Sequence, residues 1–256
     1  MEREPTRGGG NLKAVTIDFW GTLVPDGPVS DERYRLKRLT GIGAILESSG
    51  TLVSLRDLER AYAESGRWLA RIWQDHRDVP VDRHVTALLG ALDPGLPARL
   101  SSPLLASIVE AYARPALAVP PAVDRGAAKA LEILAGRGLR LGLISNTLRT
   151  PGAVLRRVLE RSGLLSAFTV LTFSDECGIR KPAPEIFRLT MRLAGVEPEE
   201  ALHVGDDPVL DIAGARATGM RVIQIAADEA PTGPVRPDAV IAGFDELPHA
   251  LDRLPV

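Results

Sequence analysis

Apolar and polar positions change their spacing twice along the chain. Short apolar runs typical of buried strands occur at 13–17, 139–144, 168–172, 201–204, 221–226 and 238–241. Around these runs, apolar positions recur with helical spacing at 123–136, 151–161, 184–194 and 208–218. Strands separated by helices pair in parallel through right-handed crossovers. The pattern therefore predicts the α/β class, with a Rossmann-like parallel sheet as its core.

The segment from 25 to 119 follows a different pattern. Prolines end the first apolar run, and no convincing strand follows until about residue 120. Apolar residues instead recur at helical spacing, as in Leu36, Leu39, Ile42 and Leu46. We therefore expect an all-helical cap at 25–119, inserted into an α/β core made of 11–24 and 120–256. Residues 1–10, with three consecutive glycines, are predicted to form a flexible N-terminus.

Composition narrows the class of protein further. The chain has 256 residues, of which 45% are apolar and 25% charged, as in an ordinary soluble globular protein. A net charge of −2 favours neither a nucleic acid nor a membrane as partner. The single cysteine, Cys177, rules out an internal disulfide, and the N-terminus lacks the apolar core of a signal peptide. We therefore expect a cytoplasmic protein; no feature indicates its oligomeric state.

Four polar clusters follow predicted strands or precede a helix. They are DFWGT at 18–22, SNT at 145–147, RKP at 180–182 and GDD at 205–207. Because the carboxyl ends of parallel strands meet along one edge of a sheet, we expect these clusters to converge on one crevice. The crevice would then contain one carboxylate, a hydroxyl, an ammonium and a pair of carboxylates. This combination is typical of covalent catalysis by an aspartate with a divalent cation.

The four clusters, in this order and context, resemble the motifs of the haloacid dehalogenase-like hydrolase superfamily, in the subgroup with a helical cap. DFWGT corresponds to the first motif, Ser145 to the second, Lys181 in RKPAPEIF to the third, and GDDPVLD at 205–211 to the fourth. The resemblance covers nearly the whole chain. It implies a hydrolase with an aspartate nucleophile and a small, anionic substrate.

The resemblance also implies a role for each matched residue. Asp18 would be the nucleophile, because a carboxylate is already ionised at neutral pH and needs no base to activate it. Mg²⁺ would be bound by Asp18, by the backbone carbonyl of Trp20 and by Asp206, which all offer hard oxygen ligands. The phosphoryl oxygens of the substrate would be bound by Ser145, Asn146 and Lys181, and Ser145 and Lys181 would also be catalytic.

Two further carboxylates of the fourth motif have structural alternatives. Asp207 precedes Pro208, the pattern of a helix N-cap followed by proline at the first helical position, and we interpret it as a cap. Asp211 lies one turn into the same helix, and the sequence leaves open whether it supports the metal site or only the helix. The histidines, among them His84 and His203, show no ligand spacing and are interpreted as structural.

Trp20 departs from the family pattern. Phosphatases of the superfamily carry a second aspartate here, which protonates the leaving oxygen and later activates water. An indole cannot exchange a proton in this way, and general acid–base help contributes about 10²- to 10⁴-fold in rate. The proton donor of a phosphatase-like enzyme would then be water or a cap residue, unless the leaving group needs little protonation.

Three hypotheses therefore stay open. The first is Mg²⁺-dependent hydrolysis of a small phosphorylated metabolite with a non-standard proton donor. The second is a metal-independent enzyme similar to the 2-haloacid dehalogenases, which also carry an aromatic residue at this position. The third is a binding protein with a residual site. The GDD cluster favours the first hypothesis, and Trp20 favours the other two.

The dehalogenase hypothesis also needs a cationic group from the cap. Arg33, Arg35 and Arg38 lie a short way after the first motif, although we interpret them as a solvated basic face of a helix. The substrate itself is not identified by the sequence, because specificity depends on the shape of a pocket rather than on a fold.

Overall fold

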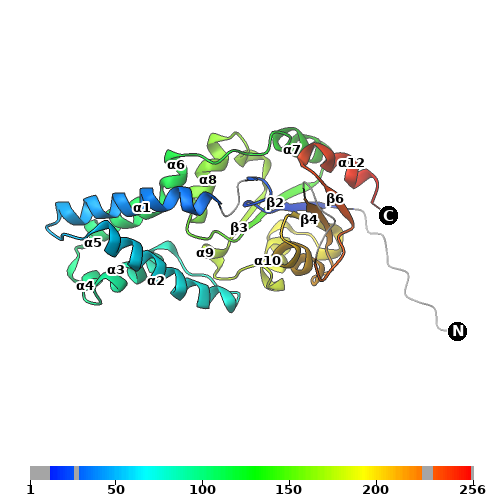
Figure 1. Ribbon diagram of the computed structural model, residues 1–256. Helices are drawn as coiled ribbons and strands as arrows, with labels where there is room; N and C mark the ends of the chain where they lie inside the picture. The colour runs from blue at the N-terminus through cyan, green and yellow to red at the C-terminus, as the bar shows by residue number, and fades with distance from the viewer. Residues whose placement is uncertain (1–11, 26–28, 227–232, 255–256) are drawn as a thin grey trace.

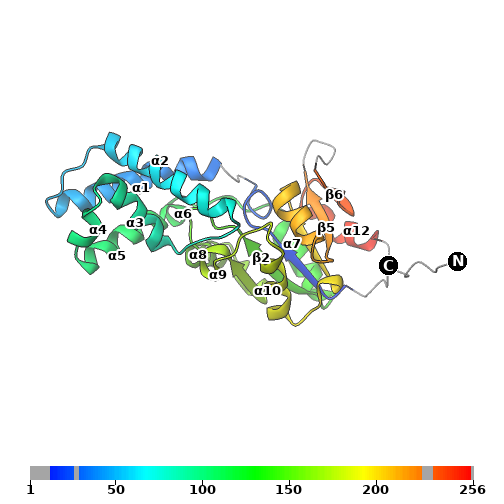
Figure 2. The ribbon, with the colours of Figure 1, turned by 90° about the horizontal axis from the view of Figure 1, so that it is seen from below.

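The computed structural model describes residues 12–25, 29–226 and 233–254, so the flexible N-terminus expected at 1–10 lies outside the described residues. A six-stranded sheet forms one part of the molecule, and a group of helices extends from one side of it (Figures 1 and 2). The strand order is β3-β2-β1-β4-β5-β6, and every neighbouring pair is parallel. The predicted α/β class and parallel sheet are therefore confirmed.

The strands and helices of the sheet domain lie close to their predicted positions. The strands are β1 (Ala14–Ile17), β2 (Arg140–Ser145), β3 (Val170–Phe173), β4 (Ala201–Gly205), β5 (Arg221–Ile225) and β6 (Ala239–Ile241). The α-helices are α7 (Ala127–Gly136), α8 (Gly152–Arg161), α9 (Ser174–Cys177), α10 (Pro184–Ala194), α11 (Gly214–Arg216) and α12 (Leu247–Asp252). Helical turns of other types are η1 (Leu165–Ala167), η2 (Pro198–Glu200), η3 (Pro208–Ala213) and η4 (Phe244–Glu246).

Apolar cores cover both faces of the sheet, because successive side chains of a strand point to opposite faces. On one face, Val15 and Ile17 of β1 belong to a core with residues of α7, α8 and α12. On the other face, Ala14 belongs to a core with Ile186, Phe187 and Met191 of α10. Figure 1 shows α7 and α12 on the side of the sheet opposite α10. The sheet is therefore covered on both faces, which leaves the carboxyl ends of its strands as the place for a site.

The remaining helices are formed by the part of the sequence between β1 and α7. They are α1 (Val29–Ser48), α2 (Leu55–Gln74), α3 (Val81–Leu92), α4 (Leu96–Arg99), α5 (Ser102–Ala113) and α6 (Pro115–Ala118). Residues of α1 to α5 share an apolar core of their own, which includes Leu39, Leu46, Leu88 and Tyr112. No element of the sheet comes from this segment among the described residues. Within the described part of the chain, no helix is long and apolar enough to cross a membrane.

Buried arginines join the helical segment to the sheet domain. Arg38 of α1 donates hydrogen bonds to the Arg149 carbonyl (3.2 Å) and to Thr150 Oγ1 (3.0 Å) in the loop after β2. Arg149 reaches back and donates to the Tyr62 carbonyl of α2 (3.2 Å). Arg38 is 0% exposed, so the interpretation of this residue as part of a solvated face is wrong. Its periodicity placed it on a helix, but only packing against the sheet domain buries it.

Candidate active site

Asp18 directly follows β1 and begins a tight turn. Its backbone N–H donates to the Val204 carbonyl of β4 (2.9 Å), and the turn is closed by Gly21 N–H to Val24 O (2.8 Å). The side chain of Asp18 is buried, with 5% of the residue exposed. Burial raises the pKa of Asp18 well above its ordinary value, opposed by Lys181 and reinforced by Asp211 and Asp206.

Asp206 follows β4 and lies against the turn that begins at Asp18. Thr22 Oγ1 donates to Asp206 Oδ1 at 2.9 Å. Gly21 has a φ of +82°, and a Cβ atom there would lie 2.3 Å from Asp206 Oδ2. Glycine is therefore required at position 21, because it accepts the positive φ and has no Cβ atom that would collide with the Asp206 carboxylate. Burial, with Asp211 nearby, raises the pKa of Asp206 to about 6.

Lys181 and Asp211 form the buried ionic centre of the site. Lys181 Nζ donates to Asp18 Oδ1 and to Asp211 Oδ1, each at 2.5 Å. Asp211 Oδ2 also accepts from the Asp207 backbone N–H at 3.1 Å. Burial disfavours ionised Asp211, but Lys181 and His203 outweigh it and lower its pKa below the usual range. The pKa of Lys181 is raised, because Asp18 and Asp211 outweigh its burial.

His203 contributes to this centre, although its sequence context predicts only a structural role. His203 Nε2 lies 3.0 Å from Asp211 Oδ1, and Nδ1 lies 2.8 Å from Thr16 Oγ1. Burial lowers the pKa of His203, which favours the neutral ring. Because ionised Asp211 can only accept, a neutral ring that carries its proton on Nε2 donates to Asp211 and fixes that carboxylate. Nδ1 is then the acceptor toward Thr16 Oγ1, which also lies 3.3 Å from the Leu202 carbonyl oxygen. The only signal in the sequence is the position of His203 in β4, two residues before Gly205, which places both on one face of the strand.

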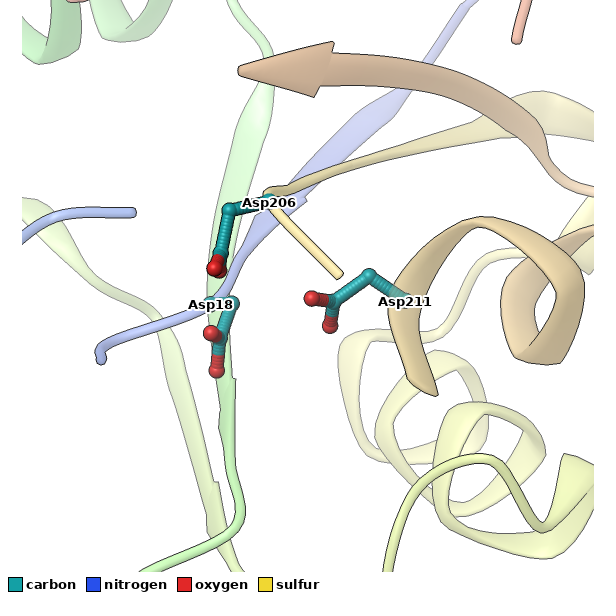
Figure 3. Close-up of side chains that lie close together, drawn as sticks. All are labelled: Asp18, Asp206 and Asp211. Carbon is teal, nitrogen blue, oxygen red and sulfur yellow. The ribbon is translucent and has the colours of Figure 1, made fainter. Parts of the chain in front are cut away.

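Three carboxylates converge at the carboxyl edge of the sheet. Ligand oxygens of Asp18, Asp206 and Asp211 lie within 4.8 Å of one another. Figure 3 shows the carboxylates of Asp206 and Asp211 turned toward Asp18. Together they carry three negative charges when ionised, against the single positive charge of Lys181. A divalent cation would offset the remaining negative charge, and oxygen ligands of this kind suit Mg²⁺.

Ser145 and Asn146 follow β2 at the same edge. Ser145 is 0% exposed, and its Oγ finds no hydrogen-bond partner among the described residues. The side-chain amide of Asn146 makes two hydrogen bonds to the backbone of Lys181. Its Nδ2 donates to the Lys181 carbonyl (3.1 Å), and its Oδ1 accepts from the Lys181 N–H (2.9 Å). Ser145 therefore keeps a hydroxyl available for a ligand, whereas Asn146 holds the backbone of Lys181.

Asp207 caps the helical turn that follows it. Its Oδ1 accepts from the Val209 and Leu210 N–H groups, both at 2.8 Å, and Pro208 occupies the first helical position. The cap interpretation of Asp207 is confirmed. Asp211 differs, because its hydrogen bonds run to Lys181 and His203 and connect it to the site as well as to the helix.

Trp20 packs into the core beside the site. Its ring meets the ring of Phe19 edge to face, with centroids 4.8 Å apart. The residue is 9% exposed, and its Nε1–H has no hydrogen-bond partner among the described residues. The position therefore offers at most an indole N–H, with no exchangeable carboxyl proton.

The fold and these motifs define a capped α/β hydrolase. A family model described as haloacid dehalogenase-like hydrolase matches residues 12–219. This match covers most of the chain, and the protein belongs to this family, as the motifs predict. It is therefore a hydrolase of this family.

Individual relatives include phosphatases and a dehalogenase. The chain is 31% identical to glyceraldehyde 3-phosphate phosphatase of Methanopyrus kandleri over 219 residues, 84% of each protein. It is 37% identical to phosphoserine phosphatase of Thermus thermophilus over 112 residues, which cover 43% of this chain and 44% of that protein. Among solved structures, 2-haloacid dehalogenase from Pseudomonas syringae matches with a TM-score of 0.70 and 26% identity, over 95% of this chain and 100% of that one.

Proposed function

We propose that this protein hydrolyses a small phosphorylated metabolite in a Mg²⁺-dependent reaction, with Asp18 as the nucleophile. The observation that carries the proposal is the cluster of Asp18, Asp206 and Asp211, in which a single ammonium, that of Lys181, binds Asp18 and Asp211 but not Asp206. A buried excess of carboxylates costs free energy unless a cation offsets it. The phosphatase names of two relatives support the same reaction class.

The residues proposed to hold Mg²⁺ are Asp18, the backbone carbonyl of Trp20, and Asp206. Asp18 and Trp20 lie on one turn, and Thr22 of that turn binds Asp206. Asp211 is proposed to stay outside the ligand set, because Lys181, His203 and the Asp207 N–H already occupy its oxygens. When bound, Mg²⁺ would offset negative charge on the phosphoryl group. It would also favour the ionised form of Asp18 against the burial that raises the pKa of this residue, so that Asp18 can act as the nucleophile.

The proposed reaction has two displacement steps. A carboxylate oxygen of Asp18 attacks phosphorus, the bond from phosphorus to the leaving oxygen breaks, and an aspartyl phosphate forms. Lys181 and Ser145 bind phosphoryl oxygens, and Lys181 also reduces repulsion between Asp18 and the anionic substrate. Water then attacks the aspartyl phosphate, which releases inorganic phosphate and restores the carboxylate.

Trp20 limits the substrates that such a site turns over quickly. The leaving oxygen receives no proton from this position, so the proposal favours leaving groups that need little protonation, as in an acyl phosphate. An ester of a basic alcohol would have to take its proton from water, at a cost in rate. An anionic substrate and a cytoplasmic location stay predictions made from the sequence.

A 2-haloacid dehalogenase activity is the second candidate. Trp20 favours it, because expulsion of halide needs no acid, and so does the likeness to the dehalogenase from Pseudomonas syringae. Asp206 opposes it, because a carboxylate that lies on Gly21 beside Asp18 adds negative charge where an anionic haloacid would bind. We therefore place the phosphatase-like activity first.

A substrate screen separates these candidates. The purified protein is assayed with acyl phosphates, phosphate monoesters and 2-haloacids, each with Mg²⁺ and with a chelator. The proposal expects phosphate release that requires Mg²⁺ and is fastest with acyl phosphates. Halide release that persists in the chelator would instead establish the dehalogenase. No turnover and no Mg²⁺ binding in calorimetry would leave a binding protein with a residual site.

A further inference from the structure

Asp78 is a buried carboxylate that lies in the helical segment, outside the predicted motifs. It belongs to the connection between α2 and α3, and its side chain is 0% exposed. This connection runs beside the segment that leads to Lys181: Asp78 N–H donates to the Gly178 carbonyl (3.1 Å), and Arg180 N–H donates to the His76 carbonyl (2.9 Å). The helical segment thus contacts the sheet domain directly before a residue of the site.

The carboxylate of Asp78 accepts four hydrogen bonds. Oδ1 accepts from Trp73 Nε1 (3.0 Å) and from the Val79 N–H (2.9 Å). Oδ2 accepts from Ser174 Oγ (2.5 Å) and from an Nη atom of Arg180 (2.6 Å). The guanidinium of Arg180 also lies 4.3 Å from the centre of a Trp73 ring. A buried carboxylate with this many donors is held in one place and holds its donors in turn.

Two of these donors lead into the loops that carry the site. Ser174 Oγ donates to Asp78 and accepts from the Thr147 N–H (3.0 Å), two residues after Ser145. Arg180 directly precedes Lys181 in the chain. One carboxylate therefore fixes a contact with the Ser145 loop and a contact with the Lys181 loop.

The two loops are also tied to each other. The Asn146 amide makes two hydrogen bonds to the Lys181 backbone, at 3.1 and 2.9 Å. The three connections close a ring: from Asp78 through Ser174 to the Ser145 loop, through Asn146 to Lys181, and back through Arg180. Loss of one contact of this ring would therefore displace Ser145 or Lys181, whose positions relative to each other matter for catalysis.

We propose that Asp78 is a positioning residue, through which the helical segment sets the two loops that place Ser145 and Lys181 against the phosphoryl group. The identity of the ligand in this inference, a phosphoryl group, rests on the proposed function. The ring of contacts around Asp78 is observed and is independent of that function. Asp78 belongs to the helical segment, whereas both loops belong to the sheet domain. The order of the phosphoryl-binding groups therefore depends on the contact between these two parts.

The test compares Asp78→Asn with the parent and with Asp124→Asn. Asparagine keeps the size of the side chain but removes the charge that holds Arg180. Asp124 accepts a hydrogen bond from the Gly126 N–H (2.8 Å) before α7, so the control makes the same chemical change away from these loops. Amide hydrogen exchange is measured by mass spectrometry on peptides that cover 145–151 and 174–183.

We expect faster exchange of both peptides in Asp78→Asn, with exchange in β4 and β5 unchanged, and neither loop peptide affected in Asp124→Asn. Ser174→Ala should mainly accelerate 145–151, and Arg180→Gln should mainly accelerate 174–183. Unchanged exchange of both peptides in a folded Asp78→Asn protein would overturn the inference. A general acceleration that includes the sheet would also overturn it, because Asp78 would then act only on stability.

Kinetics supply a second readout once a substrate is known. Misplacement of reacting groups by about 1 Å can cost 10²-fold in rate, so we expect kcat/KM of Asp78→Asn to fall by about 10- to 100-fold. Inhibition by inorganic phosphate should weaken as well, while Mg²⁺ affinity stays at the parent value. If the parent releases phosphate from neither acyl phosphates nor phosphate esters, the proposed function fails, whereas the exchange experiment still decides the role of Asp78.

Discussion

Lys181 Nζ lies 2.5 Å from Oδ1 of Asp18, although the two residues are 163 positions apart in the chain. The same ammonium holds Asp211, so a single buried cation faces two carboxylates. Removing one partner of a buried ion pair leaves an uncompensated charge, which makes Lys181 a poor choice for a clean functional test. Variants of the carboxylates that preserve their shape are more informative.

Asp18→Asn should abolish hydrolysis while the protein stays folded. Asparagine has nearly the same size and can accept the hydrogen bond of Lys181, but it is not a nucleophile and is a weaker metal ligand. Turnover of the best substrate from the screen is compared with the parent, and circular dichroism checks the fold. Activity close to that of the parent would rule out covalent catalysis by Asp18.

Trp20→Asp should raise turnover of phosphate monoesters. It would supply the missing proton donor, and general acid catalysis contributes about 10²- to 10⁴-fold where the pocket accepts the change. Because the proposed ligand at this position is a backbone carbonyl, Mg²⁺ binding should persist. A dehalogenase would respond in the opposite way, since a new carboxylate repels a haloacid; loss of halide release in this variant would support the second candidate.

Asp206→Asn and Asp211→Asn should separate metal binding from positioning. Asp206→Asn removes a proposed direct ligand, so it should weaken Mg²⁺ binding by more than the roughly 10- to 100-fold that is typical when a residue behind the ligands is changed. Asp211→Asn should instead lower kcat by about 10- to 100-fold, because Lys181 loses its second carboxylate, with a smaller change in Mg²⁺ affinity. Calorimetric titration with MgCl₂ measures both variants. The reverse ranking of affinities would make Asp211 the ligand.

His84 should make the protein less stable as the pH falls from 7 to 5. It is 2% exposed on α3, and burial lowers its pKa from 6.5 to about 4. Between these values the unfolded chain binds the proton and the folded protein does not, so protonation favours unfolding. The unfolding free energy should fall by about 2 kcal/mol over this range through His84 alone.

The variant His84→Phe provides the comparison for this pH effect. Phenylalanine keeps a ring against Tyr112, whose ring centre lies 6.1 Å from that of His84, but it does not titrate. Urea unfolding at pH 7 and pH 5 gives the free energies of both proteins. If His84→Phe loses as much stability as the parent, another group is responsible.

Much of the fold and the outline of the site follow from the sequence. The apolar runs identify the strands because strands buried on both faces need them, and the run at 13–17 lies in the same sheet as the later ones. Asp207 is recognisable as a cap because Asp-Pro at a helix start is a local signal, complete within three residues. The acidic cluster is predictable because parallel strands end at a common edge.

The remaining features depend on contacts between distant segments. Arg38 and Asp78 look like surface charges in the sequence, because a charge in a helical segment is normally solvated, and only the docking of that segment on the sheet domain buries them. His203 shows no ligand spacing, yet the fold places it between Thr16 and Asp211. Local sequence thus determined the strands, turns and caps of this protein, whereas tertiary structure decided which charges are buried together, because desolvation and pairing exist only after the segments meet.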